Sequence, residues 1–149
     1  MVANPASNLT LRPLGKANLD GSAGRLMAFL EANRAAEAFE FPFSYSYPRN
    51  CCESVSLILT YLLEEKYGLT NVVVIKGTKP RKHEHHFWVM VGNLCYDLTA
   101  HQFPKRKPII GVLAHSLFFS FSEWKIEHGR DFVNREEVLS LYRAGVIPF

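Results

Sequence analysis

Residues 52–68 read CESVSLILTYLLEEKYG, and this stretch carries the clearest helix pattern in the chain. Its apolar side chains, Val55 and Leu59 among them, recur at helical spacing along one stripe. Gly68 follows the last polar residues in the position that a helix C-cap favours, because glycine adopts the left-handed backbone conformation without steric cost. The sequence therefore predicts a helix that begins at Cys52 and ends just before this glycine.

The sequence upstream of this helix is less regular. Residues 1–21 mix Asn, Pro, Gly and Ser with scattered Leu, which is typical of a loosely structured N-terminal arm. From an N-cap at Ser22 to about Ala38, apolar side chains recur at helical spacing and predict a second helix. Residues 39–50 then form an aromatic loop punctuated by proline.

Downstream of Gly68 the pattern changes to short β-branched runs. We expect strands at residues 71–76, 87–91 and 94–98, a further strand or strand pair at 116–126, and a last helix from Asn134 to Ala144. Gly92 and Asn93 predict a tight hairpin turn between two of these strands, and Glu137 completes a capping box with Asn134. The order predicts an α+β fold in a single domain over residues 1–149, with the 52–67 helix packed on an antiparallel β-sheet.

The composition is that of an ordinary globular chain, with 48% hydrophobic and 21% charged residues. Its net charge of +3 is too small to predict binding to nucleic acid or to a membrane. No apolar run reaches the roughly 18 residues that cross a bilayer, and the first residues lack a signal-peptide pattern. We therefore expect a soluble cytoplasmic protein, or one exported by a route without a signal peptide. Its oligomeric state stays open.

The chain has three cysteines, of which Cys51 and Cys52 are adjacent. Neighbouring residues cannot easily bridge each other and an odd number leaves one over, so we expect free thiols in a reducing compartment. At the start of a helix, free backbone N–H groups and the helix dipole favour the thiolate, and the residue's own N–H can donate to an oxyanion. Cys52 is therefore a candidate nucleophile, and the alternative is that both cysteines are small buried apolar residues.

A histidine and an aspartate follow in the order that a general base and its orienting carboxylate need. Side chains alternate along a strand, so His86 shares a face with Trp88 while Phe87 points to the other face. A hairpin after this strand brings Asp97 alongside, near enough to accept the second imidazole N–H. Cys52, His86 and Asp97 are thus predicted to form a catalytic triad.

Three segments of the chain resemble the transglutaminase-like branch of the papain-like cysteine enzymes: Cys52-Glu-Ser-Val-Ser56, His86-Phe-Trp-Val and Tyr-Asp97-Leu-Thr99. In that family a cysteine opens a helix with a small residue four positions later. A His-x-Trp then lies on the following strand and an Asp-x-Thr on the next. The resemblance implies a papain-like core with Cys52 as nucleophile, His86 as general base and acid, and Asp97 as the residue that orients the imidazole.

The resemblance covers residues 50–103 and implies acyl transfer. The four-residue offset to Ser56 favours Cys52 over Cys51, which has Val55 at that offset. The implied activity is hydrolysis of an amide or peptide bond in a peptide or protein substrate, through a thioester and without a cofactor. Two alternatives stay open: transfer of the acyl group to an amine, as in a transglutaminase, and a non-catalytic binding module on the same fold.

The second donor of an oxyanion hole is also open. The candidates are the side chains of Asn50 and Gln102 and a tyrosine of residues 45–47, each of which can instead stabilise a loop. We interpret Thr99 and Gln102 as turn and packing residues.

The tract His83-Glu84-His85-His86 contains good zinc ligands. On a strand, however, His83 and His85 would face away from His86, so one metal ion could not easily use all three. We therefore favour a charged loop before a strand and expect no metal.

Overall fold

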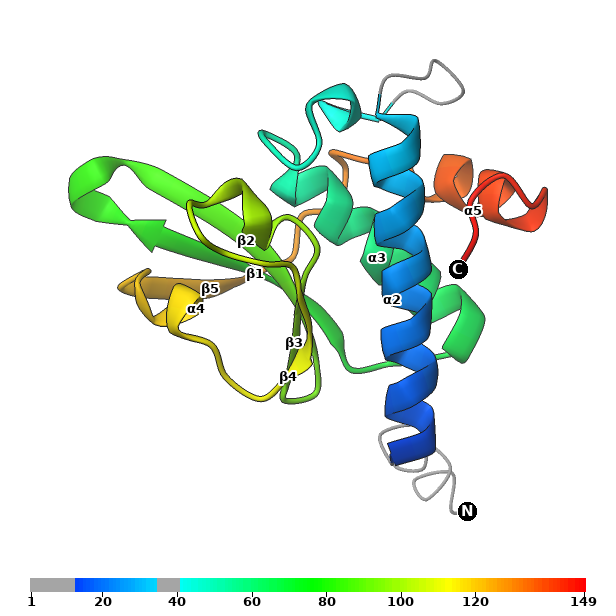
Figure 1. The fold of residues 1–149 in the computed structure, drawn as a ribbon, viewed down its shortest axis with the longest axis horizontal. Coiled ribbons are helices and arrows are strands. Elements are labelled where there is room, and N and C mark those ends of the chain that lie inside the picture. The colour runs from blue at the N-terminus through cyan, green and yellow to red at the C-terminus, as the bar shows by residue number, and fades with distance from the viewer. Residues whose placement is uncertain (1–12, 35–40) are drawn as a thin grey trace.

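The computed structural model describes residues 13–34 and 41–149 and shows an α+β fold around a five-stranded antiparallel sheet (Figure 1). The helices and strands are α2 (Pro13–Asn33), α3 (Cys52–Tyr67), β1 (Val72–Lys79), β2 (Glu84–Val91), β3 (Leu94–Asp97), β4 (Ile109–Val112), α4 (Ser116–Phe119), β5 (Glu123–Glu127) and α5 (Arg135–Arg143). Short 3-10 turns lie at Ser44–Ser46, Pro80–Lys82 and Ala100–Gln102. The strands follow the order β4-β3-β2-β1-β5. The predicted α+β class with an antiparallel sheet is confirmed.

Helix α3 is the centre of the fold and has the bounds that the sequence predicts. Residues 54–63 are all buried, which is more than the single apolar stripe expected. Figure 1 shows the reason: the sheet lies on one side of α3, while α2 crosses it and α5 lies against it on other sides. Gly68 ends the helix with φ 62°, and its N–H donates to the carbonyl of Glu64 at 3.0 Å. This enclosure fixes the position of Cys52, the first residue of α3.

Helix α2 begins at Pro13, well before the predicted start at Ser22. The predicted N-terminal arm is therefore wrong for residues 13–21. Residues 1–12 and the predicted helix end at Ala38 lie outside the described residues. The buried stripe of α2 consists of Leu19, Ala23, Leu26 and Leu30. Gly21 and Gly24, which lie between these positions, weaken the helical pattern in the sequence, and packing against the core overrides their low helix propensity.

Strands β1, β2 and β3 form two successive hairpins, and the sequence predicts the second of them, at Gly92-Asn93. Strands β1 and β2 extend further than expected toward the turn that joins them. Lys79 and Glu84 are the last paired residues before that turn. This extension places His86 within β2, opposite Gly77 of β1. Gly92 adopts φ 58° in the second turn, a conformation that favours glycine.

The sheet edges differ from the sequence-based expectation. Strand β4 was not predicted, because Gly111 interrupts it with φ 66° and reads as a turn residue. This glycine lets the strand approach Asp20 of α2 closely. The predicted strand or strand pair over residues 116–126 contains helix α4 before β5. His115 caps that helix, since its Nδ1 accepts a hydrogen bond from the N–H of Leu117 at 3.0 Å.

Helix α5 starts at the predicted capping box. The side-chain oxygen of Asn134 accepts a hydrogen bond from the N–H of Glu137 at 2.9 Å. Val138 and Leu139 are buried in the core that α3 shares, and Gly145 follows the helix with φ 78°. The prediction of this helix is confirmed to within one residue at its end.

The two faces of the sheet bury different sets of side chains. Val72, Val74, Val89 and Val91 pack with α3, whereas Ile75, Trp88 and Cys95 pack with Leu117, Phe118 and Phe121 on the other face. The Trp88 ring stacks on Phe118 at 4.4 Å between centroids. It also covers Gly77, where a Cβ atom would lie 2.6 Å from the indole. The face that carries His86 therefore has its own small aromatic core.

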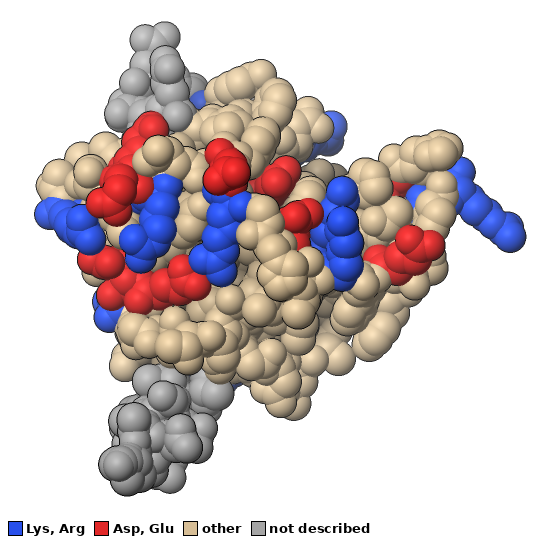
Figure 2. Space-filling view, turned by 180° about the vertical axis from the view of Figure 1, so that it is seen from behind, with Lys and Arg blue, Asp and Glu red and all other residues tan. Residues whose placement is uncertain are grey.

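The molecular surface shows no segregation of charge on the face seen in Figure 2, where acidic and basic side chains are interspersed. Among the helices in the described part of the chain, none combines the length and the apolarity that a bilayer span requires.

Replacing Gly77 with alanine should destabilise the fold, because the new methyl group would overlap the Trp88 indole. We expect the free energy of unfolding to fall by about 1–3 kcal/mol in urea denaturation. Gly24 is the matched control: it lies within α2 with nothing within 4 Å of the added methyl group. Gly24→Ala should instead raise stability by up to ~1 kcal/mol through helix propensity. Equal effects of the two substitutions would contradict the packing described here.

Candidate active site

Cys52 lies where the chain enters α3. Asn50 turns the backbone with φ 58°, and Cys51 takes the N-cap position. Cys51 makes no side-chain capping hydrogen bond to any described residue, so the first-turn N–H groups of α3 remain available to an external acceptor. The thiol of Cys52 is partly exposed while Cys51 is buried. The helix start thus presents Cys52 rather than its neighbour.

His86 and Asp97 form a buried hydrogen-bonded pair across neighbouring strands. The imidazole Nε2 lies 2.6 Å from Oδ2 of Asp97, and both side chains are 1% exposed. A carboxylate can only accept hydrogen bonds, so Nε2–H is the donor. The second carboxylate oxygen, Oδ1, accepts from the backbone N–H of Thr99 at 3.1 Å and from its hydroxyl at 3.2 Å. The predicted proximity of His86 and Asp97 is therefore present, and Thr99 holds the carboxylate in place.

The Cys52 thiol lies near the same imidazole, close enough to influence its pKa. With Nε2 engaged by Asp97, Nδ1 is the ring nitrogen left for Cys52. It is buried and makes no hydrogen bond of ordinary geometry with any of the residues described. The thiol is nevertheless close enough that its interaction with the ring raises the pKa of His86. The predicted residues Cys52, His86 and Asp97 are thus brought together in that order.

The pKa of His86 reflects two opposing effects. Burial, the largest, lowers the pKa because it removes water from the charged ring. The charge and hydrogen bond of Asp97, with a further contribution from Cys52, more than offset it and raise the pKa above the ordinary value. The site therefore favours the imidazolium ion, the form that stabilises a neighbouring thiolate.

Three aromatic rings enclose the imidazole. Phe103 meets it edge-on at 4.9 Å between centroids, Phe121 stacks on it at 5.7 Å, and Trp88 lies at 5.9 Å. These contacts fix the plane of the ring and exclude water from it. Sequence reasoning missed Phe121, which comes from the Phe-rich segment interpreted as a strand. The hydrogen bonds of Thr99 were also missed, although the Asp-x-Thr spacing is typical of a side-chain-to-backbone turn.

The other two cysteines are in unreactive environments. Burial, followed by the charge of Cys52, raises the pKa of Cys51 to about 12. Burial, the larger effect, and the negative charge of Asp97, the smaller one, both raise the pKa of Cys95. Both thiols therefore stay protonated near neutral pH, and a protonated thiol is a poor nucleophile.

The candidates for the second oxyanion-hole donor differ in whether their side chains already make hydrogen bonds. The hydroxyl of Tyr47 donates to the carbonyl of Leu98 at 2.6 Å, which makes it a structural residue. The amide nitrogen of Gln102 lies 3.5 Å from the hydroxyl of Thr99, so it supports the Asp97 turn. Asn50 is exposed and lies two residues before Cys52. Tyr45 is exposed as well, so Asn50 and Tyr45 are the candidates whose side chains form no hydrogen bond with a described residue.

The histidine-rich tract does not gather into a metal site in the described residues, which contain no group of three or more His, Cys, Asp or Glu side chains suited to a metal ion. His83 lies in the turn before β2 with φ 52°, which agrees with the expected charged loop before a strand. His85 is exposed, and its Nδ1 lies 3.0 Å from the hydroxyl of Thr78.

Comparisons with protein-family models, with curated proteins and with solved structures gave no match to this chain.

Replacing Asp97 with asparagine should lower the pKa of His86. In the wild type we expect the imidazole to stay protonated at pH values above about 6.5, which is the ordinary histidine pKa. In Asp97→Asn the effect of burial is no longer offset, so the pKa should fall toward or below that value. NMR titration of the His86 ring nitrogens measures both, and an unchanged titration curve would contradict the assigned pairing.

The same pair should make stability depend on pH. Because folding raises the pKa of His86, the protonated imidazole stabilises the folded state. This contribution is fully present below about pH 6.5. It is lost as the pH rises through the raised folded-state pKa. Urea unfolding from pH 6 to alkaline pH should show this decline in the wild type and a flatter dependence in Asp97→Asn. His85→Asn, which alters an exposed histidine of the same strand, should retain the wild-type slope.

Proposed function

We propose that this protein is a cysteine-dependent hydrolase that cleaves an amide or peptide bond through a thioester on Cys52. The observation that carries the proposal is the buried imidazole of His86: its Nε2 is hydrogen-bonded to Asp97, its Nδ1 has no partner among the described residues, and Cys52 is close enough to influence its pKa. An acyl-transfer nucleophile needs this arrangement, in which the base is itself oriented by a third group. Burial of the pair restricts the movement of both side chains.

The first half of the reaction forms the thioester. The Cys52 thiol gives its proton to Nδ1 of the neutral imidazole, which forms the imidazolium ion that the site favours, and the thiolate sulfur attacks the carbonyl carbon of the substrate. The carbonyl oxygen becomes an oxyanion, and the backbone N–H of Cys52 at the start of α3 is positioned to donate to it. When the tetrahedral intermediate collapses, the C–N bond breaks and the leaving amine takes the proton from Nδ1.

The second half releases the acid. A water molecule gives a proton to Nδ1 as its oxygen attacks the thioester carbon. The C–S bond then breaks, and the proton returns from Nδ1 to the Cys52 sulfur. Throughout, Asp97 keeps Nε2 protonated, so that Nδ1 is the nitrogen that exchanges protons. An amine in place of water would give transamidation by the same steps.

We also infer a papain-like core of the transglutaminase-like kind. The support is the order of the elements: a helix that begins at the nucleophile, a strand that carries the histidine, and the next strand that carries the aspartate. The antiparallel pairing of β2 with β3 is the feature that joins the last two residues.

Iodoacetamide labelling at neutral pH tests the proposal. Cys52 should react at least about tenfold faster than a model thiol, while Cys51 and Cys95 stay unlabelled in the folded protein. His86→Ala should slow the labelling of Cys52 toward the rate of the model thiol, because the imidazolium is lost. Peptide mapping by mass spectrometry assigns each labelled cysteine.

The matched controls are Cys51→Ala and His85→Ala, which alter the neighbours of two triad residues. Both should leave the labelling rate of Cys52 unchanged. If Cys52 reacts no faster than a model thiol, or if His86→Ala leaves its rate unchanged, the activated nucleophile is ruled out.

A further inference from the structure

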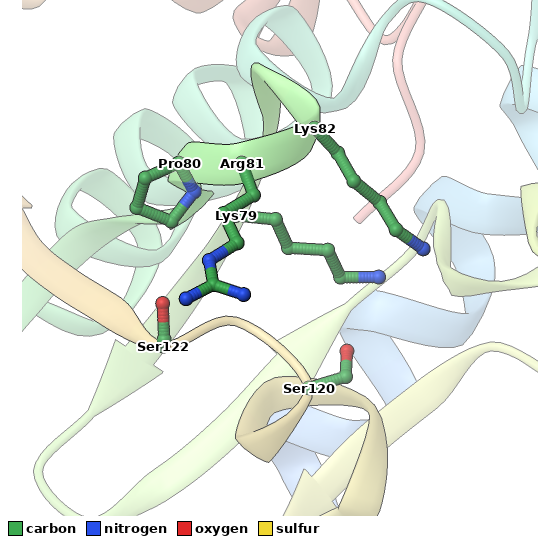
Figure 3. Close-up of a pocket in the computed structure, with 6 residues that line it drawn as sticks. All are labelled: Lys79, Pro80, Arg81, Lys82, Ser120 and Ser122. Carbon is green, nitrogen blue, oxygen red and sulfur yellow. The ribbon is translucent and has the colours of Figure 1, made fainter.

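A cavity of about 620 Å³ lies between the β1–β2 connection and the segment that joins α4 to β5. Its lining residues are Lys79, Pro80, Arg81, Lys82, Ser120 and Ser122 (Figure 3). In Figure 3 the guanidinium of Arg81 lies near Ser122, while the side chains of Lys79, at the end of β1, and of Lys82 extend away from Ser122. The lining thus combines three cations with hydroxyl groups and contains no carboxylate.

The three cations differ in their ion pairing with the described residues. Lys79 is 3.2 Å from the Glu84 carboxylate. Arg81 and Lys82 are exposed and form no ion pair with any residue that the structure describes. A pair of adjacent cations repels itself, so an anion bound between them relieves that repulsion as well as gaining its own attraction. The cavity is therefore suited to an anionic ligand.

The cavity adjoins the candidate active site through one side chain. Phe121 lies between the two lining serines, and the ammonium group of Lys79 is 4.7 Å from its ring centroid. The same ring stacks on the imidazole of His86, at 5.7 Å between centroids, and also contacts Trp88 and Phe103. A single phenyl ring thus separates the basic cavity from the catalytic histidine.

We propose that this cavity binds an acidic side chain of the peptide substrate, an inference that rests on the proposed function. The planar guanidinium of Arg81 can bind a carboxylate in a bidentate manner, and Lys82 and the serine hydroxyls supply further donors. The 3-10 turn at Pro80–Lys82 presents these groups from the end of a hairpin whose strands are fully paired. Substrates with Asp or Glu close to the scissile bond are therefore favoured over neutral or basic ones.

A second basic cavity serves as a control for the effect of positive charge alone. It has a volume of about 560 Å³ and is lined in part by Lys105, Arg106 and Lys107. Arg106 in this cavity already donates to the Ser116 hydroxyl at 3.0 Å. No ring contact or ion pair joins these lysines to the active-site residues in the described structure. If positive charge alone mattered, both cavities would bind anions equally.

Binding of fluorescein-labelled hexaglutamate, measured by fluorescence anisotropy, tests the assignment. Three proteins are compared: the wild type, Arg81→Gln/Lys82→Gln, and the control Lys105→Gln/Lys107→Gln with the same change in net charge. We expect the first variant to bind at least about tenfold more weakly, since two charge-assisted contacts are lost, and the control to bind like the wild type. Equal weakening in both variants, or equal binding of hexaglutamine, would overturn the proposal. Tighter binding of a single-stranded oligonucleotide than of hexaglutamate would assign the cavity to nucleic acid and overturn it as well.

A second measurement links the cavity to the active site. Saturating hexaglutamate should slow the iodoacetamide labelling of Cys52 in the wild type and leave it unchanged in Arg81→Gln/Lys82→Gln. If Cys52 is activated but not protected, the proposed function stands and the substrate assignment fails. If Cys52 is not activated even without peptide, the proposed function fails, and any binding of hexaglutamate then marks a carboxylate site without a catalytic role.

Discussion

The hydrogen bond between His86 and Asp97 is the interaction on which the arrangement of this molecule depends. Both side chains are almost completely shielded from water, and a buried charged pair is tolerated only when its geometry satisfies both partners. Several elements of the fold supply that geometry. The antiparallel register of β2 and β3 sets the two residues side by side, Thr99 binds the far carboxylate oxygen, and aromatic rings hold the imidazole from both sides.

The nucleophile depends on a second constraint, the enclosure of α3. This helix is covered by the sheet and by two other helices, so its first residue has little freedom to move. The main core lies on the sheet face opposite His86, where Phe87 and Val89 point toward α3. Only the start of the helix reaches the imidazole. A shift of α3 by one turn would therefore remove Cys52 from Nδ1 without disturbing the His86–Asp97 pair.

Much of this arrangement follows from local sequence. Alternation along β2 and a glycine turn are enough to predict that His86 and Asp97 lie together, and Gly68 marks the end of α3. The parts that were missed depend on contacts between distant segments. In the sequence, Gly111 of β4 indicates a turn. In the structure, its positive φ occurs where the strand comes into close contact with α2.

The aromatic surroundings of His86 were missed for a similar reason. Phe121 belongs to a Phe-rich segment whose periodicity fits a strand, but the His115 cap folds the start of that segment into α4. The ring of Phe121 then packs against His86 of β2. The periodicity of a single segment cannot predict a contact with another strand. The same ring contacts Lys79 of the basic cavity, so the link proposed between this cavity and His86 is visible only in three dimensions.

Acyl transfer to Cys52 is tested most directly with a small activated ester such as 4-nitrophenyl acetate. The account predicts a burst of nitrophenolate close to one equivalent, an acetyl group on Cys52 in the trapped protein by mass spectrometry, and slower turnover that follows. His86→Ala should suppress both phases while the protein remains folded. An acetyl group found only on lysines, or the same nitrophenolate release from Cys52→Ala as from the wild type, would contradict the central claim.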